Sequence, residues 1–131
     1  MRNSKITFCA SLIGLFLVFA ACCYYDEVLP EDLKISDDQQ ISFANDIIPI
    51  FNQSCNFAGC HNSPSQPPDL LPANAYNSLN NGGYINIASP ENSELYQWMK
   101  GNRGTPMPVE GANAAYNAKV LTWIRQGALN N

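Results

Sequence analysis

Charged residues are scarce in this sequence, and basic residues are the scarcest. Only 14% of the 131 residues are charged, and seven Lys and Arg stand against eleven Asp and Glu, a net charge of −4. A nucleic-acid-binding protein needs a basic face to neutralise phosphates, so this balance argues against that class. The low charge also excludes a coiled coil, and eight Gly and nine Pro without a period exclude a collagen-like repeat.

Strand signals and histidine are scarce as well. No alternating apolar run is long, and Tyr84–Ile87 is at most a short extended piece. His61 is the only histidine, so no Ser-His-Asp set is possible without it. There is no internal repeat. These absences predict an all-α domain with long loops rich in Pro and Asn.

The first 21 residues read as an export signal. A basic tip, Met1–Lys5, precedes a run without charge at 6–21, which is shorter than the ~20 residues that a spanning helix needs. The run ends in Phe19-Ala20-Ala21-Cys22, which resembles a bacterial lipobox. We therefore expect a lipoprotein signal peptide at 1–21 and lipidation at Cys22, with the mature protein anchored on the periplasmic side of a membrane or at the cell surface. An ordinary signal peptide cut nearby would instead leave a soluble exported protein.

An acidic stretch follows, and we interpret 22–40 as a tether. Loss of residues 1–21 leaves five basic side chains against eleven acidic ones, a net charge of −6. Such a balance favours partners with a basic face. The folding domain would be 41–131, which is small enough to need a disulfide, a metal or a cofactor as a staple.

Capping and apolar spacing predict four short helices. The first is expected over about 46–54, with Asp46 as N-cap and Pro49 in the first turn. A second is expected over 72–79, with Tyr76 and Leu79 facing inward. A third should begin at Ser89-Pro90-Glu91 and stop at Gly101, with an apolar face of Leu95, Trp98 and Met99. The last should run over about 113–126, before Gly127.

One short motif carries the chemistry. Cys55-Asn56-Phe57-Ala58-Gly59-Cys60-His61 places two thiols just before an imidazole. This is the logic of c-type haem attachment, in which the thiols become thioethers and the adjacent histidine reaches the iron. Four residues separate the cysteines here, instead of the more usual two. The motif predicts one covalently attached haem c.

A second iron ligand is expected at Met107. It lies in Gly104-Thr105-Pro106-Met107-Pro108, where flanking prolines can fix a loop that presents one side chain. A thioether is a soft ligand suited to haem iron, and Met/His ligation raises the reduction potential. The rival is Met99, for which packing beside Trp98 is the more natural role.

The order of motifs resembles a small single-haem cytochrome c domain, of the kind found in lipoproteins and large enzymes of Bacteroidetes- and Planctomycetes-like bacteria. The resemblance covers about 90 residues and rests on these segments: Asp46–Phe51, Gly59–His61, Asp69–Leu71, Ser93–Tyr96, Met107-Pro108 with Gly111, and Trp123–Ala128. It implies a cytochrome c fold, in which the first and last helices cross and the haem lies between them and the loops. It also implies thioethers at Cys55 and Cys60, with His61 and Met107 as axial ligands.

Supporting residues can be named as well. A carbonyl from Pro67 or Pro68 is expected to accept the His61 Nδ1–H. Leu70 and Leu71 are expected to pack on the ring, with Trp123 nearby. The implied function is single-electron transfer between redox partner proteins, without nucleic acid.

Other functions stay open at this stage. A Cys55–Cys60 disulfide could staple a membrane-tethered interaction module without haem. A zinc site would have only Cys55, Cys60 and His61 close together, where structural zinc usually has about four ligands. An open iron position could support a small peroxidase-like enzyme, but no second histidine is present to assist it. We favour an electron carrier over a catalyst.

Overall fold

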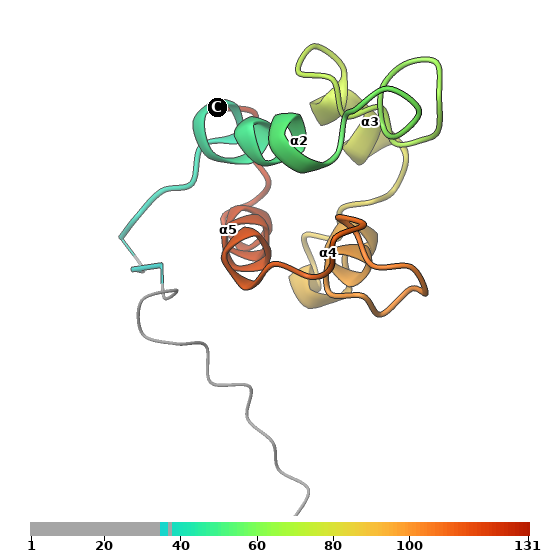
Figure 1. Ribbon diagram of the computed structural model, residues 1–131. Coiled ribbons are helices and arrows are strands. Elements are labelled where there is room, and N and C mark those ends of the chain that lie inside the picture. Colours follow the sequence, from blue (N-terminus) through green and yellow to red (C-terminus); the bar gives the residue numbers. More distant parts are fainter. Residues whose placement is uncertain (1–34, 37) are drawn as a thin grey trace, which may run out of the picture.

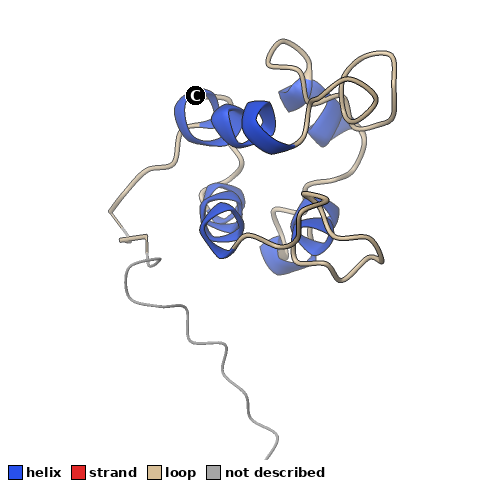
Figure 2. Cartoon of the chain, in the orientation of Figure 1, coloured by secondary structure: helices blue, strands red, loops and turns tan. Residues whose placement is uncertain are grey.

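The computed structural model describes residues 35–36 and 38–131, and its helices are arranged around the middle of the domain (Figure 1). The element order is η2 (Phe43–Ile47), α2 (Ile48–Ser54), α3 (Ala75–Asn81), η3 (Pro90–Asn92), α4 (Glu94–Met99) and α5 (Ala114–Arg125). Within the described residues there is no strand, and long loops connect the helices (Figure 2). The all-α prediction is thus confirmed at the level of fold class. The expected signal peptide at 1–21 and Cys22 lie outside the described residues.

The first helical segment begins earlier than predicted. Ser42, not Asp46, is the N-cap: its Oγ accepts the Asn45 N–H at 3.2 Å, while Asp46 Oδ2 accepts the Ser42 N–H at 3.0 Å. The first turn, η2, is a π-helix. Because Pro49 has no N–H to offer the Asn45 carbonyl, a regular α-helical ladder cannot form across this turn.

The second helix, α3, covers 75–81 rather than 72–79. Asp69 explains the later start, since its Oδ1 accepts the Leu71 N–H at 3.0 Å and its Oδ2 accepts the Asn74 side-chain amide at 2.8 Å. These bonds hold the segment before α3 in turns instead of a helix. Leu79 is buried and Tyr76 packs against the core, as expected.

The third predicted helix is two pieces. A 3-10 turn, η3, is separated from α4 by Ser93, whose backbone is extended (φ −60°, ψ 130°). Ser93 is fully buried, and its Oγ accepts the Asn86 N–H at 2.9 Å. This bond holds Ser93 out of the helix. Gly101 ends the segment with φ +80°, a conformation that favours glycine.

The last helix matches its prediction closely. Asn113 caps α5 by accepting the Tyr116 N–H at 3.1 Å, and Gly127 terminates it with φ +95°. Its apolar face is buried and consists of Val120, Leu121, Trp123 and Ile124. Trp123 packs against Phe43 of η2 with ring centroids 5.1 Å apart, and in Figure 1 α5 is seen nearly end-on beneath α2. The core therefore joins the two ends of the described domain.

The helices are short. None of those in the described part of the chain combines the length and apolarity that a bilayer-spanning segment requires.

Candidate functional site

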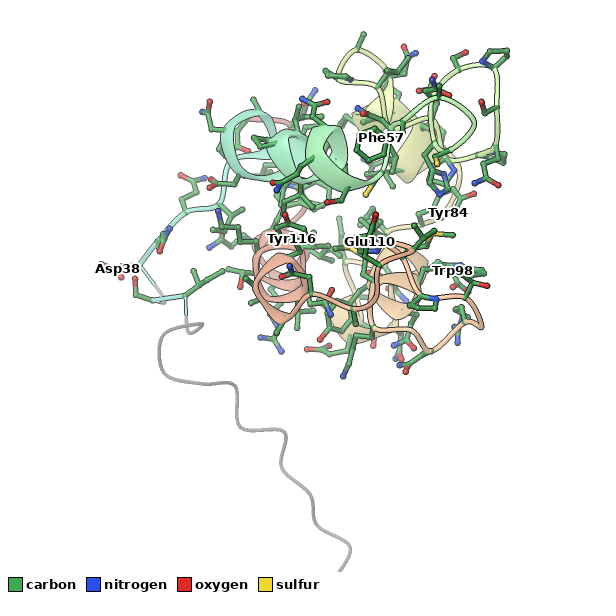
Figure 3. All side chains as sticks on the ribbon, in the orientation of Figure 1. Asp38, Phe57, Tyr84, Trp98, Glu110 and Tyr116 are labelled. Carbon is green, nitrogen blue, oxygen red and sulfur yellow. The ribbon has the colours of Figure 1, made fainter. Side chains whose placement is uncertain are left out.

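A cavity of about 260 Å³ lies between α2, α4 and the loops that follow α2, α3 and α4. Figure 3 shows the labelled side chains of Phe57, Tyr84, Trp98 and Glu110 around this region. The wall of the cavity is mostly apolar. The volume of the cavity is close to the lower end of the ~300–1,000 Å³ range of small-molecule pockets. The four residues expected to hold haem, Cys55, Cys60, His61 and Met107, all line it. The lining residues are Phe51, Ser54, Cys55, Phe57, Cys60, His61, Gln66, Pro67, Pro68, Leu70, Tyr84, Leu95, Trp98, Met99, Met107, Pro108, Val109 and Glu110.

The loop between the two cysteines contains a tight turn. The Cys60 N–H donates to the Phe57 carbonyl at 2.9 Å, and Gly59 has φ +84° at the third position of this turn. A positive φ at that position is typical of a type II turn and favours glycine. Phe57, Ala58 and Gly59 are exposed, whereas Cys55 and Cys60 are partly buried. The turn therefore takes up the wider spacing, and both cysteines still line the cavity.

His61 is held by the segment that the sequence indicated. Its Nδ1 lies 3.1 Å from the Pro68 carbonyl oxygen. Because a carbonyl can only accept, Nδ1 carries the proton and Nε2 is the ring nitrogen with a lone pair. The His61 backbone is fixed on both sides, since its N–H donates to the Cys55 carbonyl at 3.1 Å and its carbonyl accepts from Leu70 at 2.7 Å. The expectation of an acceptor at Pro67 or Pro68 is confirmed for Pro68.

Cys55 is an unusually weak acid. The pKa of its thiol is raised from 9.0 to about 11, chiefly by burial and to a smaller extent by the negative charge of Glu110 and by the neighbouring Cys60. A thiol with this pKa is neutral at pH 7. A neutral thiol or thioether lies in an apolar wall without a desolvation cost.

Two methionines face the cavity from different segments. Met107 is partly buried, and its backbone N–H donates to the Trp98 carbonyl at 3.2 Å, which ties its loop to α4. Met99 is only 3% exposed and belongs to the hydrophobic core. Both line the cavity, so the structure brings the predicted ligand and its rival into one site.

Two expected packing residues lie elsewhere. Leu71 does not line the cavity, whereas Leu70 does. Trp123 does not line it either: its ring is fully buried beside Phe43, and its Nε1–H donates to the Leu129 carbonyl at 2.9 Å. The aromatic residues that do face the cavity are Phe51, Phe57, Tyr84 and Trp98.

Sequence reasoning missed Tyr84 and Glu110 as cavity residues, and it named Trp98 only as part of an apolar helix face. The spacing of Leu95, Trp98 and Met99 on one helix could have indicated Trp98, since all three line the cavity. No local pattern marks Glu110, because its place depends on how the loop after α4 folds back toward Cys55.

The structure also bears on the alternatives. Cys55 and Cys60 are both free thiols. Among residues 35–36 and 38–131, no group of three or more His, Cys, Asp or Glu side chains converges as a metal site would. The described residues therefore offer no zinc-like cluster.

Comparison with known proteins gives no relative. No family model, no curated protein and no solved structure matches this chain.

Proposed function

We propose that this chain is a c-type cytochrome that carries single electrons between redox partner proteins. One observation carries the proposal: two thiols, an imidazole and a methionine thioether, drawn from positions 55–107, line one mostly apolar cavity. This set matches the groups that attach and ligate haem in c-type cytochromes. A cytochrome c fold is part of the same proposal.

The residues fit a haem in their chemistry. Cys55 and Cys60 are free and would hold the group as thioethers, each adding its sulfur and its hydrogen across one vinyl double bond. The neutral state of the Cys55 thiol suits a group that ends as an uncharged thioether in an apolar wall. Bound haem would supply the Fe(III)/Fe(II) couple.

His61 and Met107 would provide the iron ligands. The bond from His61 Nδ1 to the Pro68 carbonyl leaves Nε2 as the nitrogen with a lone pair, and it fixes the orientation of the ring. The N–H of Met107 anchors its loop to the Trp98 carbonyl, which limits the movement of the thioether. Apolar side chains from Phe51, Leu70 and Leu95 would exclude water from the group.

The setting of the protein is proposed from the sequence. A lipid on Cys22 would anchor the domain on the periplasmic side of a bacterial membrane or at the cell surface, with 22–40 as a tether. The acidic balance favours redox partners with a basic face.

Intact-mass analysis of protein made in a host with haem-c maturation tests the proposal. The wild type should carry the added mass of one haem after denaturation, because thioethers survive unfolding. A double Cys55→Ala/Cys60→Ala variant should lose it, and His61→Ala should largely abolish mature holoprotein. Ser54→Ala, a change in the cavity wall without a proposed role, should keep the haem. A wild type that carries a Cys55–Cys60 disulfide and no haem would refute the proposal and favour a disulfide-stapled module.

A further inference from the structure

The orientation of His61 depends on a neighbouring segment of chain. Its Nδ1–H donates to the Pro68 carbonyl, so the ring is held only as firmly as Pro68 itself. Pro68 and Leu70 are both buried, whereas Gln66 and Pro67 just before them are exposed. The position of the 68–70 segment therefore decides where the acceptor of the His61 proton lies.

Three hydrogen bonds fix the 68–70 segment. The Leu70 N–H donates to the His61 carbonyl at 2.7 Å, and the Asp69 N–H donates to Ser78 Oγ at 2.8 Å. The third comes from the Asn56 side chain, whose Nδ2 donates to the Leu70 carbonyl at 3.2 Å. Asn56 is thus a side chain of the haem-attachment motif that holds this segment directly.

Asn56 is itself held in place. Its Nδ2 also donates to Asn52 Oδ1 at 2.7 Å, and its backbone N–H donates to the Phe51 carbonyl at 2.9 Å. A side-chain amide has two N–H bonds, so both acceptors are satisfied at once. The amide group therefore bridges the end of α2 to the 68–70 segment.

We propose that Asn56 is a positioning residue for His61. It fixes the Leu70 carbonyl, and through it the Pro68 carbonyl that keeps the proton on His61 Nδ1. The hydrogen-bonded chain from Asn56 to His61 does not depend on haem. Only the use of the opposite nitrogen, Nε2, as an iron ligand rests on the proposed function. The motif thus contains its own orienting side chain, next to the first cysteine.

The test measures hydrogen exchange of the His61 Nδ1 proton by NMR. The chain has a single histidine, so histidine labelled with ¹⁵N gives one ring signal. The protein is used as purified from a host with haem-c maturation and kept under dithionite, so that any iron is Fe(II). Wild type should exchange slowly, and Asn56→Asp should exchange about tenfold faster or more, because the acceptor moves more freely.

Asn80→Asp is the matched control. Asn80 Nδ2 also donates to a backbone carbonyl, that of Tyr76 at 2.9 Å, but Asn80 does not line the cavity. Its variant should exchange like the wild type at His61. Backbone amides in α5 should exchange at unchanged rates in both variants, which a merely structural role for Asn56 would not allow.

Two results would overturn the proposal. One is an Asn56→Asp variant whose Nδ1 proton exchanges as slowly as in the wild type. The other is equally faster exchange at His61 and throughout α5. If Asn56→Asp fails to fold, Asn56→Ser is measured in the same way, and a failure of both to fold would also overturn it. A colourless wild type with a protected Nδ1 proton would instead refute the haem and leave the role of Asn56 standing.

Discussion

At the residue scale, two methionines line the cavity, and the proposal makes Met107 rather than Met99 the iron ligand. Met107 lies on a loop anchored to Trp98, and Met99 is a core residue at 3% exposure. We expect Met107→Ala to keep covalent haem but to lower the reduction potential and admit exogenous ligands, because Met/His ligation raises the potential. Redox potentiometry and ligand titration would check this.

Met99→Ala should behave in the opposite way. It should cost about 2–5 kcal/mol of unfolding free energy through the cavity that it leaves, with little change in reduction potential. A potential that falls in Met99→Ala and not in Met107→Ala would reverse the assignment of the two methionines.

The raised pKa of the Cys55 thiol should make the stability of the haem-free protein depend on pH. The pKa of this thiol rises from 9.0 to about 11 on folding, so the folded state favours the neutral thiol. The contribution of the neutral thiol to the free energy of unfolding is fully present below pH 9 and is lost as the pH rises through 11. The free energy of unfolding falls by at most about 1.4 kcal/mol per pH unit in this range.

Urea unfolding of protein made without haem maturation, at pH 8 and pH 10.5, measures this loss. Cys55→Ser is the control, and the difference between wild type and variant should shrink at the higher pH. A difference that does not change with pH would contradict the buried state of the thiol. In the haem-loaded protein the dependence should vanish, since a thioether does not titrate.

At the element scale, the turn at 57–60 allows the wide spacing of the cysteines. Gly59 has φ +84°, and a Cβ added there would meet no atom within 4 Å, so alanine at this position is strained by the backbone alone. Gly59→Ala should cost about 1–2 kcal/mol and reduce the yield of attached haem.

Gly83→Ala is the comparison for Gly59. Gly83 has φ +73° with the same open surroundings, but it lies outside the motif. Its variant should lose similar stability and keep the haem yield. Equal haem yields in the two variants at equal stability would show that the turn does not matter for attachment.

Local signals predicted the elements that depend on local bonds. The last helix, its Gly127 terminator and the Pro68 acceptor follow from short-range chemistry, and the structure has them. The break at Ser93 could not be predicted, because its buried hydroxyl bonds to Asn86, which lies in the preceding loop. The π-helical turn at η2 likewise depends on how the Ser42 cap and Pro49 combine.

At the scale of the whole molecule, the C-cap residue of α5, Gln126, holds the start of the domain. Gln126 Oε1 accepts the Ile41 N–H at 2.8 Å, and its Nε2 donates to the Gln39 carbonyl at 2.8 Å. Gln126→Ala should cost about 1–2 kcal/mol, because two backbone groups lose their partner. Gln126→Glu keeps the acceptor alone and should cost less. Chemical denaturation would rank the unfolding free energies of the wild type and the two variants. Equal stability of all three would contradict a stabilising role for the two Gln126 hydrogen bonds.

The candidate site itself was predictable only in part. The Cys-x4-Cys-His motif predicted Cys55, Cys60 and His61, and the flanking prolines predicted Met107. Each of these signals lies within a few residues of the side chain concerned. The cavity wall formed by Tyr84, Trp98 and Glu110 depends on segments that meet only in the folded chain. Trp123 was misplaced for the same reason: a helical pattern shows that a residue is buried, not which neighbour buries it.

The most direct test of the central claim is an absorption spectrum of the purified protein, oxidised and then reduced with dithionite, followed by acid-acetone extraction. Protein made in a host with haem-c maturation should show a sharp α-band on reduction, and the colour should stay with the protein after extraction. A colourless protein, from a host that matures a control cytochrome, would contradict the claim that Cys55, Cys60, His61 and Met107 form a haem site.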